Sequence, residues 1–454
     1  MIVVKFGGTS VADAAAIARA AAITRGRLSR QPLVVVSALA RATNELLAIA
    51  EQAAQGQLIV ALRGVEGLRE RHLAECRTLL GEGAEADEVR SELSAMCDEL
   101  ASLSEALSVL GHLTPRSLDA IGAYGELLSS TLVHAAFCRF GLPTELVDAR
   151  DVMVTDELYT RAVPDLDAIT ERARHVLLPI IENGRVPVVG GFIGRSARGI
   201  TTTIGRGGGD FSAALFGAAL GVDAIEIWTD VDGMLTADPR TVPRARLIEE
   251  IRFDEAAELA TFGAKVLHPS TIAPAVQRGI PVFIFNSRRP EGRGTRITAD
   301  APRRPVSAIA GKGNVTVIRV TSSRMLLAPG FLRTLFEVFE RHHTSVDVVA
   351  TSEVSVSVTV DDPARLDELV VDLRALGDVS IERNRAVVAM VGAGLAGDSA
   401  TMSRALGALG GVRVHMISLS ATEINLTIII DGDRLADAMR ALHAEFFDRA
   451  SEAA

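Results

Sequence analysis

The chain has 454 residues, enough for roughly three domains with cores of their own. Acidic residues outnumber basic ones, giving a formal net charge of −10, and aromatic residues make up only 4% of the chain. This composition predicts no nucleic-acid partner and no membrane partner, because anionic polymers and surfaces attract basic proteins and single strands need aromatic platforms.

Three scattered cysteines without a CxxC motif exclude a disulfide framework and favour a reducing compartment. The first residues, MIVVKFGG, lack the basic and long apolar segments of a signal peptide. No run of about 18 apolar residues is long enough to span a bilayer. We therefore expect a cytoplasmic protein.

The first 58 residues alternate between strand and helix patterns. A β-rich run at 2–6 ends at two glycines, and an alanine-rich helix follows to about residue 25. Ser10 and Asp13 have the S-x-x-D spacing of a helix start. A second strand is expected at 33–37 and a second helix at 43–58. This rhythm predicts an α/β fold with a largely parallel sheet.

The middle of the chain changes character. Residues 59–140 are charged and poor in strand signals, so we expect long helices there, with a hinge at 81–88. Four further strands are expected, at 144–148, 186–189, 224–229 and 281–285. The segment 288–305 is rich in Pro, Arg and Gly and has the composition of a linker.

The C-terminal part repeats itself. Residues 351–361 align with 421–431, and 317–320 fall on 387–390 at the same offset of 70. Each copy has a β-loop-α-β-β-α pattern, which is typical of a ferredoxin-like domain. Two copies predict tandem small domains and not a solenoid.

Three glycine loops follow predicted strands, at 7–8, 190–194 and 205–209. Glycine lets backbone N–H groups approach an anion closely, and Lys5 and Arg206 add positive charge. Together the loops predict a polyphosphate cradle, although a glycine pair after a strand is also a common tight turn. The sequence has no Walker A motif and no protein-kinase motif set.

The segment 226–240 is dense in carboxylates and turn residues. Asp230, Asp232 and Asp238 could orient Mg²⁺ waters or a ribose, and Arg240 could meet a phosphate. An Asp-Gly turn followed by a capped helix explains the same residues equally well. A glycine pattern at 392–397 matches GxGxxG, but the acidic residue expected at the end of the next strand is missing, so we expect no dinucleotide there.

Four motifs resemble those of the aspartokinases, a family of the amino-acid kinase superfamily. They are KFGGTSV (5–11), TTTIGRGGGDFSAA (201–214), EIWTDVDGMLTADPR (226–240) and KVLHPST (265–271), and the C-terminal repeat resembles a pair of ACT domains. The resemblance implies an αβα kinase domain over 1–290 with a helical insertion at about 60–140. It further implies a linker over 291–312 and ACT domains over 313–384 and 385–454.

The resemblance implies transfer of a phosphoryl group from ATP to the β-carboxylate of L-aspartate, which opens the synthesis of lysine, threonine and methionine. A carboxylate is ionised at neutral pH and needs no general base. Mg²⁺ is expected to arrive with ATP, with no metal site of the protein's own. Paired ACT domains imply a homodimer or a dimer of dimers.

The resemblance also assigns roles to single residues. Lys5 should neutralise the transferred phosphoryl group, with Asp210 holding Lys5. Arg206 should pair with the α-carboxylate of aspartate and Glu126 with its ammonium, while Thr43 helps to seat it. The ATP site should comprise Lys5, Gly7, Gly8, Thr9, Ser37, Thr229, Asp230, Leu235, Arg240, Lys265 and Val266.

Two segments of the first repeat, 324–332 and 345–355, resemble the effector-binding edge of lysine-sensitive and plant-type aspartokinases. The chemistry of Asp347 and Glu353 suits a cationic amino acid such as lysine, although both could be ordinary residues at strand ends. Threonine as effector, or no effector, stays open, as do a kinase of another acidic amino acid and a sensor with a silent kinase. The matching positions are Met325, Ala328, Phe331, Leu332, Val346, Asp347, Ser352 and Glu353.

Overall fold

The computed structural model describes residues 1–205, 207–262, 269–326, 329–361, 366–395, 397–419 and 422–448. The chain forms two units, which we describe separately. The first comprises Met1–Met234 and Val266–Asp300, and the second comprises Leu235–Lys265 and Ala301–Ala454. Within the described ranges, no helix combines the length and the apolar character that a membrane span requires.

The first unit is built on a sheet with the strand order β3-β5-β2-β1-β8-β10-β11. Neighbouring strands pair in parallel except β10 and β11, which confirms the predicted α/β fold with a largely parallel sheet. The strands are β1 (Ile2–Phe6), β2 (Pro32–Val36), β3 (Thr144–Val147), β5 (Val186–Gly190), β8 (Ala224–Thr229), β10 (Val282–Asn286) and β11 (Thr295–Ile297). A small second sheet contains β4 (Val154–Thr155), β6 (Ile193–Ser196) and β7 (Thr201–Thr203).

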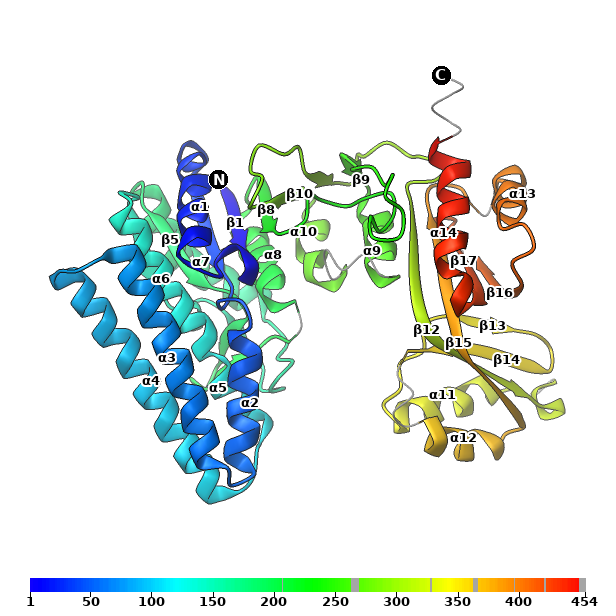
Figure 1. Ribbon diagram of the computed structural model, residues 1–454, viewed down its shortest axis with the longest axis horizontal. Helices are drawn as coiled ribbons and strands as arrows, with labels where there is room; N and C mark the ends of the chain where they lie inside the picture. Colours follow the sequence, from blue (N-terminus) through cyan, green and yellow to red (C-terminus); the bar gives the residue numbers. More distant parts are fainter. Residues whose placement is uncertain are drawn as a thin grey trace. The chain divides into compact units, whose positions relative to one another are not determined.

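Helices surround this sheet (Figure 1). The predicted helical stretch 59–140 is confirmed, and its hinge is shorter than expected because the fourth helix already begins at Ala84. The helices are α1 (Ala14–Arg25), α2 (Ala42–Ala54), α3 (Leu58–Leu80), α4 (Ala84–Leu110), α5 (Pro115–Gly122), α6 (Tyr124–Arg139), α7 (Leu166–Glu182), α8 (Gly208–Leu220) and α10 (Ala273–Gln277).

The start of α1 differs from the S-x-x-D prediction. Asp13 is the N-cap, and its side chain accepts a hydrogen bond from the backbone N–H of Ala16. Ser10 lies in a short 3₁₀ turn, and its hydroxyl donates to the carbonyl of Trp228 at 3.0 Å. Ser10 therefore ties the first glycine loop to β8 and does not cap the helix.

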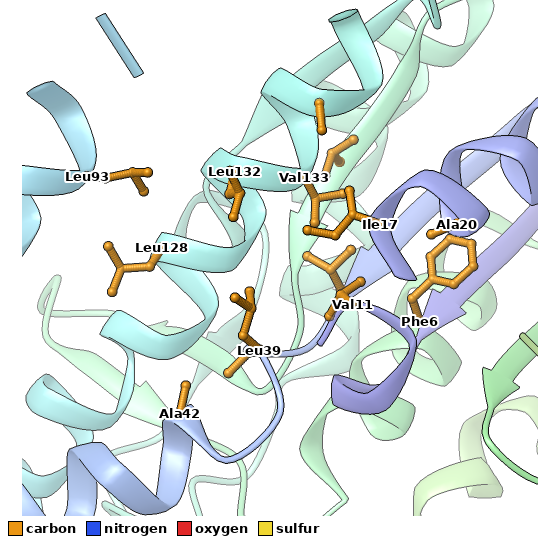
Figure 2. Packing of buried hydrophobic residues seen from close by; sticks show 14 of the residues in the cluster. Phe6, Val11, Ile17, Ala20, Leu39, Ala42, Leu93, Leu128, Leu132 and Val133 are labelled. Atoms are coloured by element: carbon orange, nitrogen blue, oxygen red, sulfur yellow. The ribbon is translucent and has the colours of Figure 1, made fainter. Parts of the chain in front are cut away.

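The core of the first unit holds the strand ends in fixed positions. Strand β1 is buried along its whole length, as expected for a central parallel strand with a continuous apolar run. Figure 2 shows Phe6 of β1, Ile17 of α1 and Val133 of α6 within this core. Each fully buried side chain of this size contributes about 1.5–3 kcal/mol of hydrophobic stabilisation. The loops that leave the strands thus start from a rigid platform.

The second unit contains the predicted repeat. Its sheet has the order β13-β14-β12-β15-β17-β16, and its described strand pairs are antiparallel. The first copy consists of β12 (Ala308–Thr321), α11 (Phe331–Arg341), β13 (Val349–Thr351), β14 (Ser355–Val360) and α12 (Leu366–Arg374). The second consists of β15 (Asp378–Val391), α13 (Ser399–Ala408), β16 (Val414–Leu419), β17 (Asn425–Asp431) and α14 (Leu435–His443). The β-α-β-β-α order confirms the prediction for both copies.

The two copies share their longest strands. After an irregularity at 312–315, the second part of β12 pairs with β14 and with the first part of β15. The first part of β12, residues 308–312, pairs with 387–391 and supplies the fourth strand of the second copy. The predicted linker 291–312 therefore contains strand residues, both here and in β11.

The described segment 235–262 packs in the second unit, although the resemblance places it in the kinase domain. Ala237 and Val242 belong to the same core cluster as Ile309 and Met390. The backbone N–H of Ile309 also donates to the carbonyl of Thr236 at 2.8 Å. This segment includes β9 (Glu250–Ile251) and α9 (Phe253–Thr261).

Candidate active site

A cavity of about 910 Å³ lies in the first unit, at the carboxyl ends of β1 and β2. Its volume suits a small-molecule site, and its position follows the rule that ligands of parallel sheets bind at this edge. Six residues that the sequence analysis singled out line it together: Lys5, Gly8, Ser37, Thr43, Glu126 and Asp210.

Lys5 and Asp210 form an ion pair in this cavity. Lys5 is the penultimate residue of β1, and its Nζ lies 2.6 Å from Oδ1 of Asp210, in the first turn of α8. The two side chains are only 9% and 16% exposed. The N-terminus of α8 also directs backbone N–H groups and the positive end of its dipole to this region. The arrangement suits an anion that carries several charges.

The glycine loops converge around Lys5. A Cβ on Gly209 would lie 2.9 Å from Oγ of Ser37 and 3.1 Å from Cε of Lys5. A Cβ on Gly191 would lie 2.9 Å from Cα of Gly209. Positions 191 and 209 therefore require glycine because any side chain there would meet neighbouring atoms, and not because a turn demands a left-handed backbone. The backbone N–H of Gly7 donates to the carbonyl of Trp228 at 3.0 Å and fixes the first loop to β8.

Glu126 is a buried carboxyl group that forms no ion pair with any residue that the structure describes. It lies in the first turn of α6, and its Oε1 accepts a hydrogen bond from the N–H of Ala38 at 3.2 Å. Its Oε2 is buried and has no hydrogen-bond partner among the described residues. Burial raises the pKa of Glu126 to about 8, opposed by the Ala38 N–H and by the charge of Lys5. A cation bound in the cavity would complete this site.

Asp119 is a cavity residue that the sequence analysis missed. It is buried in α5 and accepts hydrogen bonds from the N–H groups of Thr160 and Thr203 and from the Thr203 hydroxyl, the last at 2.6 Å. Burial raises its pKa, and these three bonds oppose the rise. Asp119 thus holds β7 and the loop at Thr160 beside the cavity. Its helical surroundings in the sequence give no signal for this role.

Backbone strain also gathers at the cavity. Arg41, Thr160 and Phe192 line it and have φ angles of 72°, 68° and 64°. The left-handed region costs a non-glycine residue about 1 kcal/mol or more, and such residues concentrate at functional sites. No sequence pattern predicts these three positions.

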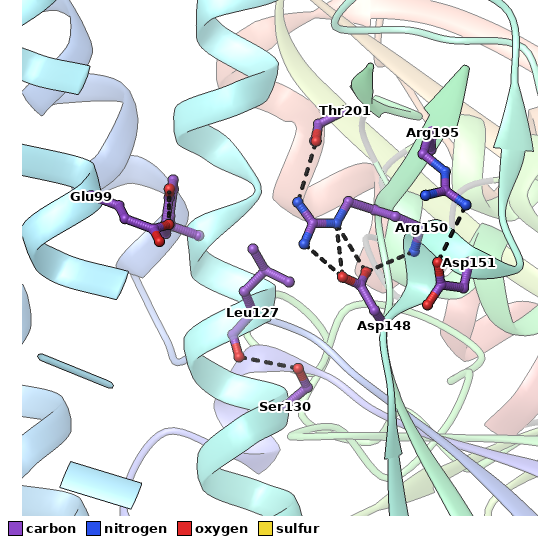
Figure 3. A network of polar contacts seen from close by, with 9 residues as sticks. Glu99, Leu127, Ser130, Asp148, Arg150, Asp151, Arg195 and Thr201 are labelled. Atoms are coloured by element: carbon purple, nitrogen blue, oxygen red, sulfur yellow. Dashed lines mark hydrogen bonds and ion pairs between the residues drawn. The ribbon is translucent and has the colours of Figure 1, made fainter. Parts of the chain in front are cut away.

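A second cavity of about 460 Å³ borders α4 and α6, and of the positions that the sequence analysis singled out its lining contains Gly190, from the second glycine loop. The Tyr124 hydroxyl, which lines it, donates to Glu99 at 2.9 Å. The guanidinium of Arg150 donates to Asp148 and to the hydroxyl of Thr201 (Figure 3). The main polar groups of this second cavity therefore pair with one another, whereas Glu126 in the larger cavity has an oxygen that no described residue contacts by a hydrogen bond.

The segment 226–240 is divided between the two units. Thr229 and Asp230 follow β8, and the carbonyl of Thr229 accepts a hydrogen bond from the N–H of Ser287 at 2.8 Å. Asp232 accepts from the side-chain amide of Asn286 at 2.7 Å. In the second unit, Asp238 accepts from the backbone N–H and the guanidinium of Arg240. Asp238 and Arg240 thus form the local turn that the sequence left open.

The other predicted site residues fall outside the cavity lining or outside the described residues. Gly7, Thr9, Thr229 and Asp230 belong to the first unit but are not among the lining residues. Leu235 belongs to the second unit, where it forms a β-bridge with Leu247. The positions outside the described residues are Arg206, Lys265, Val266 and Ala328.

The described effector positions lie in the first copy. Met325, Phe331 and Val346 pack against its core. Leu332 is 41% exposed, and the hydroxyl of Ser352 is 2.8 Å from that of Ser355. Glu353 is exposed, between β13 and β14, whereas the side chain of Asp347 is 21% exposed and forms an ion pair with Lys312.

Comparisons with known proteins identify the family of the chain and of its domains. The amino acid kinase family model matches residues 1–286, and an ACT domain model matches residues 388–446. Lysine-sensitive aspartokinase 3 of Escherichia coli is 36% identical over 99% of both chains. Chloroplastic aspartokinase 3 of Arabidopsis thaliana is 35% identical over 98% of this chain and 81% of its own.

Two solved structures are similar over the whole chain. E. coli aspartokinase III in complex with lysine and aspartate has a TM-score of 0.85 at 36% identity, covering 98% of this chain and 99% of that one. The same enzyme in complex with aspartate and ADP has a TM-score of 0.84 at 36% identity, covering 98% and 100%.

Proposed function

Since this chain belongs to the aspartokinase family, we propose that the cavity around Lys5, Glu126 and Asp210 is its catalytic site. The enzyme transfers the γ-phosphoryl group of ATP to the β-carboxylate of L-aspartate. A carboxylate oxygen forms a bond to the γ-phosphorus, the bond to the ADP oxygen breaks, and 4-phospho-L-aspartate leaves. The observation that carries the site assignment is the unpartnered Oε2 of Glu126, buried in a cavity with Lys5 and Asp210.

Lys5 acts on the phosphoryl group that is transferred. Phosphoryl transfer depends on positioning and on neutralising charge, and the ionised substrate needs no general base. Asp210 holds Lys5 in place, so that its ammonium can stabilise the charge that develops on the transferred group. The backbone of Gly8 and Gly209 offers close approach to phosphate oxygens. Mg²⁺ would accompany ATP and neutralise the phosphates further.

Glu126 binds the substrate L-aspartate. Its free oxygen would accept the ammonium of L-aspartate, which leaves the β-carboxylate directed to the phosphoryl group. The E. coli relative has been solved with aspartate bound, which supports this substrate. Thr43 lines the same cavity, and Arg206 retains its role as partner of the α-carboxylate from the family resemblance.

The nucleotide is assigned to the loops beside the cavity. Gly7, Thr9, Ser37, Thr229 and Asp230 occupy loops that follow the neighbouring strands β1, β2 and β8. Leu235, Arg240, Lys265 and Val266 retain their proposed ATP contacts from the resemblance alone. The E. coli relative has been solved with ADP, which supports a nucleotide substrate.

The test is ATP-dependent formation of acyl phosphate, trapped with hydroxylamine. L-Aspartate should give hydroxamate at a rate well above that from L-glutamate at equal concentrations. A faster reaction with L-glutamate would identify a kinase of another acidic amino acid. No product with either substrate, while ATP still binds, would identify a sensor with a silent kinase.

We further propose that lysine inhibits the enzyme by binding to the first ACT copy. Asp347 and Glu353 supply carboxylates for a cationic amino acid, and the E. coli relative has been solved with lysine bound. Lysine should lower the rate of hydroxamate formation, and Glu353→Ala should weaken that inhibition. Inhibition by threonine alone, or by neither amino acid, would overturn the assignment.

A homodimer is proposed on the exposed edges of the second unit's sheet. Val349 on β13, and Ile417 and Leu419 on β16, are large apolar residues that are about two-fifths exposed. Sedimentation equilibrium should give twice or four times the chain mass of 48.0 kDa. A monomer at micromolar concentration would contradict the proposal.

A further inference from the structure

Lys312 lies where the two copies of the second unit meet. It ends the part of β12 that completes the sheet of the second copy, since it pairs in register with Val387 of β15. Its side chain crosses to the first copy, where Nζ is 3.2 Å from Oδ2 of Asp347 and contacts Oδ2 of Asp361. Figure 1 shows β12 and β15 running alongside each other through both copies.

The cluster is anionic and partly shielded from water. Two carboxylates share one ammonium, and the side chains of Lys312, Asp347 and Asp361 are 28%, 21% and 45% exposed. Burial raises the pKa of Asp347, and the nearby Asp361 raises it further, while Lys312 opposes the rise. An additional cation near Asp347 would therefore be favourable, but it would have to share or replace the existing partner.

We propose that Lys312 is an internal competitor for the cationic effector, because its ammonium occupies the carboxylate of Asp347 that the effector needs. The inference rests on the proposed lysine site in the first copy. Binding of free lysine displaces Lys312 from Asp347 and leaves it with Asp361 alone. The contact between the copies therefore loosens when the effector binds, and Lys312 sets the concentration of lysine that is required.

The corresponding cluster of the second copy provides an internal comparison. At the offset of 70, Glu382 and Asp431 correspond to Lys312 and Asp361. Asp431 is held by Arg385 at 2.6 Å and by His415 at 2.9 Å. Ile417 occupies the position that corresponds to Asp347, so no carboxylate stands there for an effector. The second carboxylate of this cluster, Glu382, pairs with Arg385 at 3.1 Å and with His415 at 3.2 Å. Competition should therefore involve Lys312 and not Arg385.

The experiment measures lysine binding by calorimetry and lysine inhibition by hydroxamate formation, using the full chain. Lys312→Met keeps most of the side-chain length and removes the charge. Because ion pairs at this exposure are modest, we expect the Kd and the half-inhibitory concentration of lysine to fall about three- to tenfold. Lys312→Arg should keep values near those of the wild type, and Arg385→Met is the matched control, with unchanged lysine affinity.

Each outcome bears on the inference. Lysine binding by Lys312→Met that is equal to or weaker than that of the wild type would overturn the competition. Binding by Lys312→Met alone would support it, because the wild-type ammonium would then exclude lysine. Absence of binding in both proteins, with a normal melting curve, would overturn the lysine site itself. Asp347→Asn, introduced into the wild type and into Lys312→Met, should abolish the difference in lysine affinity between them, which a purely structural effect of Lys312 would not do.

Discussion

Glu126 should make the affinity for L-aspartate depend on pH. Burial raises its pKa to about 8, so the carboxyl group is largely protonated at neutral pH. The ionised fraction rises from about one tenth at pH 7 to about three quarters at pH 8.5. Only the ionised form can pair with the substrate ammonium, so the apparent affinity follows this fraction. KM for L-aspartate should therefore fall about eightfold between pH 7 and pH 8.5.

The assay is hydroxamate formation at saturating ATP, with KM for aspartate measured at half-unit steps of pH. Glu126→Gln cannot ionise, so its KM should be raised about 100-fold at pH 8.5 and should vary little with pH. Glu105→Gln, on the exposed face of α4, is the matched control and should retain the wild-type slope. A flat wild-type profile, or a Glu126→Gln profile that keeps the wild-type slope, would refute the reasoning.

Three further predictions concern the cavity and the helical core. Asp210→Asn should lower kcat about 100-fold with a smaller effect on the KM for aspartate, because Lys5 loses its anchor; an unchanged kcat would contradict this. Gly209→Ala should lower kcat at least tenfold with little change in melting temperature, since the added methyl group meets Ser37 and Lys5; wild-type turnover would count against the close packing. His72 is buried and its pKa is lowered to about 4 by burial, so the unfolded chain takes up the proton first as the pH falls below about 6.5. The folded state should lose about 2 kcal/mol between pH 7 and pH 5, and thermal melts of His72→Leu should lack this part of the loss.

The strands and glycine loops could be predicted because their signals are local. The run at 2–6 is apolar at nearly every position, as a strand buried on both faces must be, and Gly7-Gly8 mark its end. Lys5 and Asp210 are 205 positions apart in the chain, and only the family resemblance indicated that they would meet. The ion pair forms because β1 ends, and α8 begins, at the same edge of the sheet.

The features that sequence could not supply depend on tertiary contacts. In the sequence Asp119 has the pattern of an ordinary helix residue. Its role depends on hydrogen bonds from β7 and from the loop at Thr160, which are distant in the chain. The left-handed conformation of Phe192 follows from the packing around the cavity and not from its own preference. The repeat offset is real, but a linear alignment could not reveal that β12 serves both copies. The same limit applies to 235–262, whose apolar residues pack in the second unit.

Hydroxamate formation from L-aspartate and ATP by the wild type and by Lys5→Met tests the central claim most directly. The wild type should produce aspartyl hydroxamate, and Lys5→Met should reduce kcat at least 1,000-fold while keeping a normal melting curve, because the charge that faces the transferred phosphoryl group is gone. Turnover of Lys5→Met within about tenfold of the wild type would contradict the assignment of this cavity as the catalytic site.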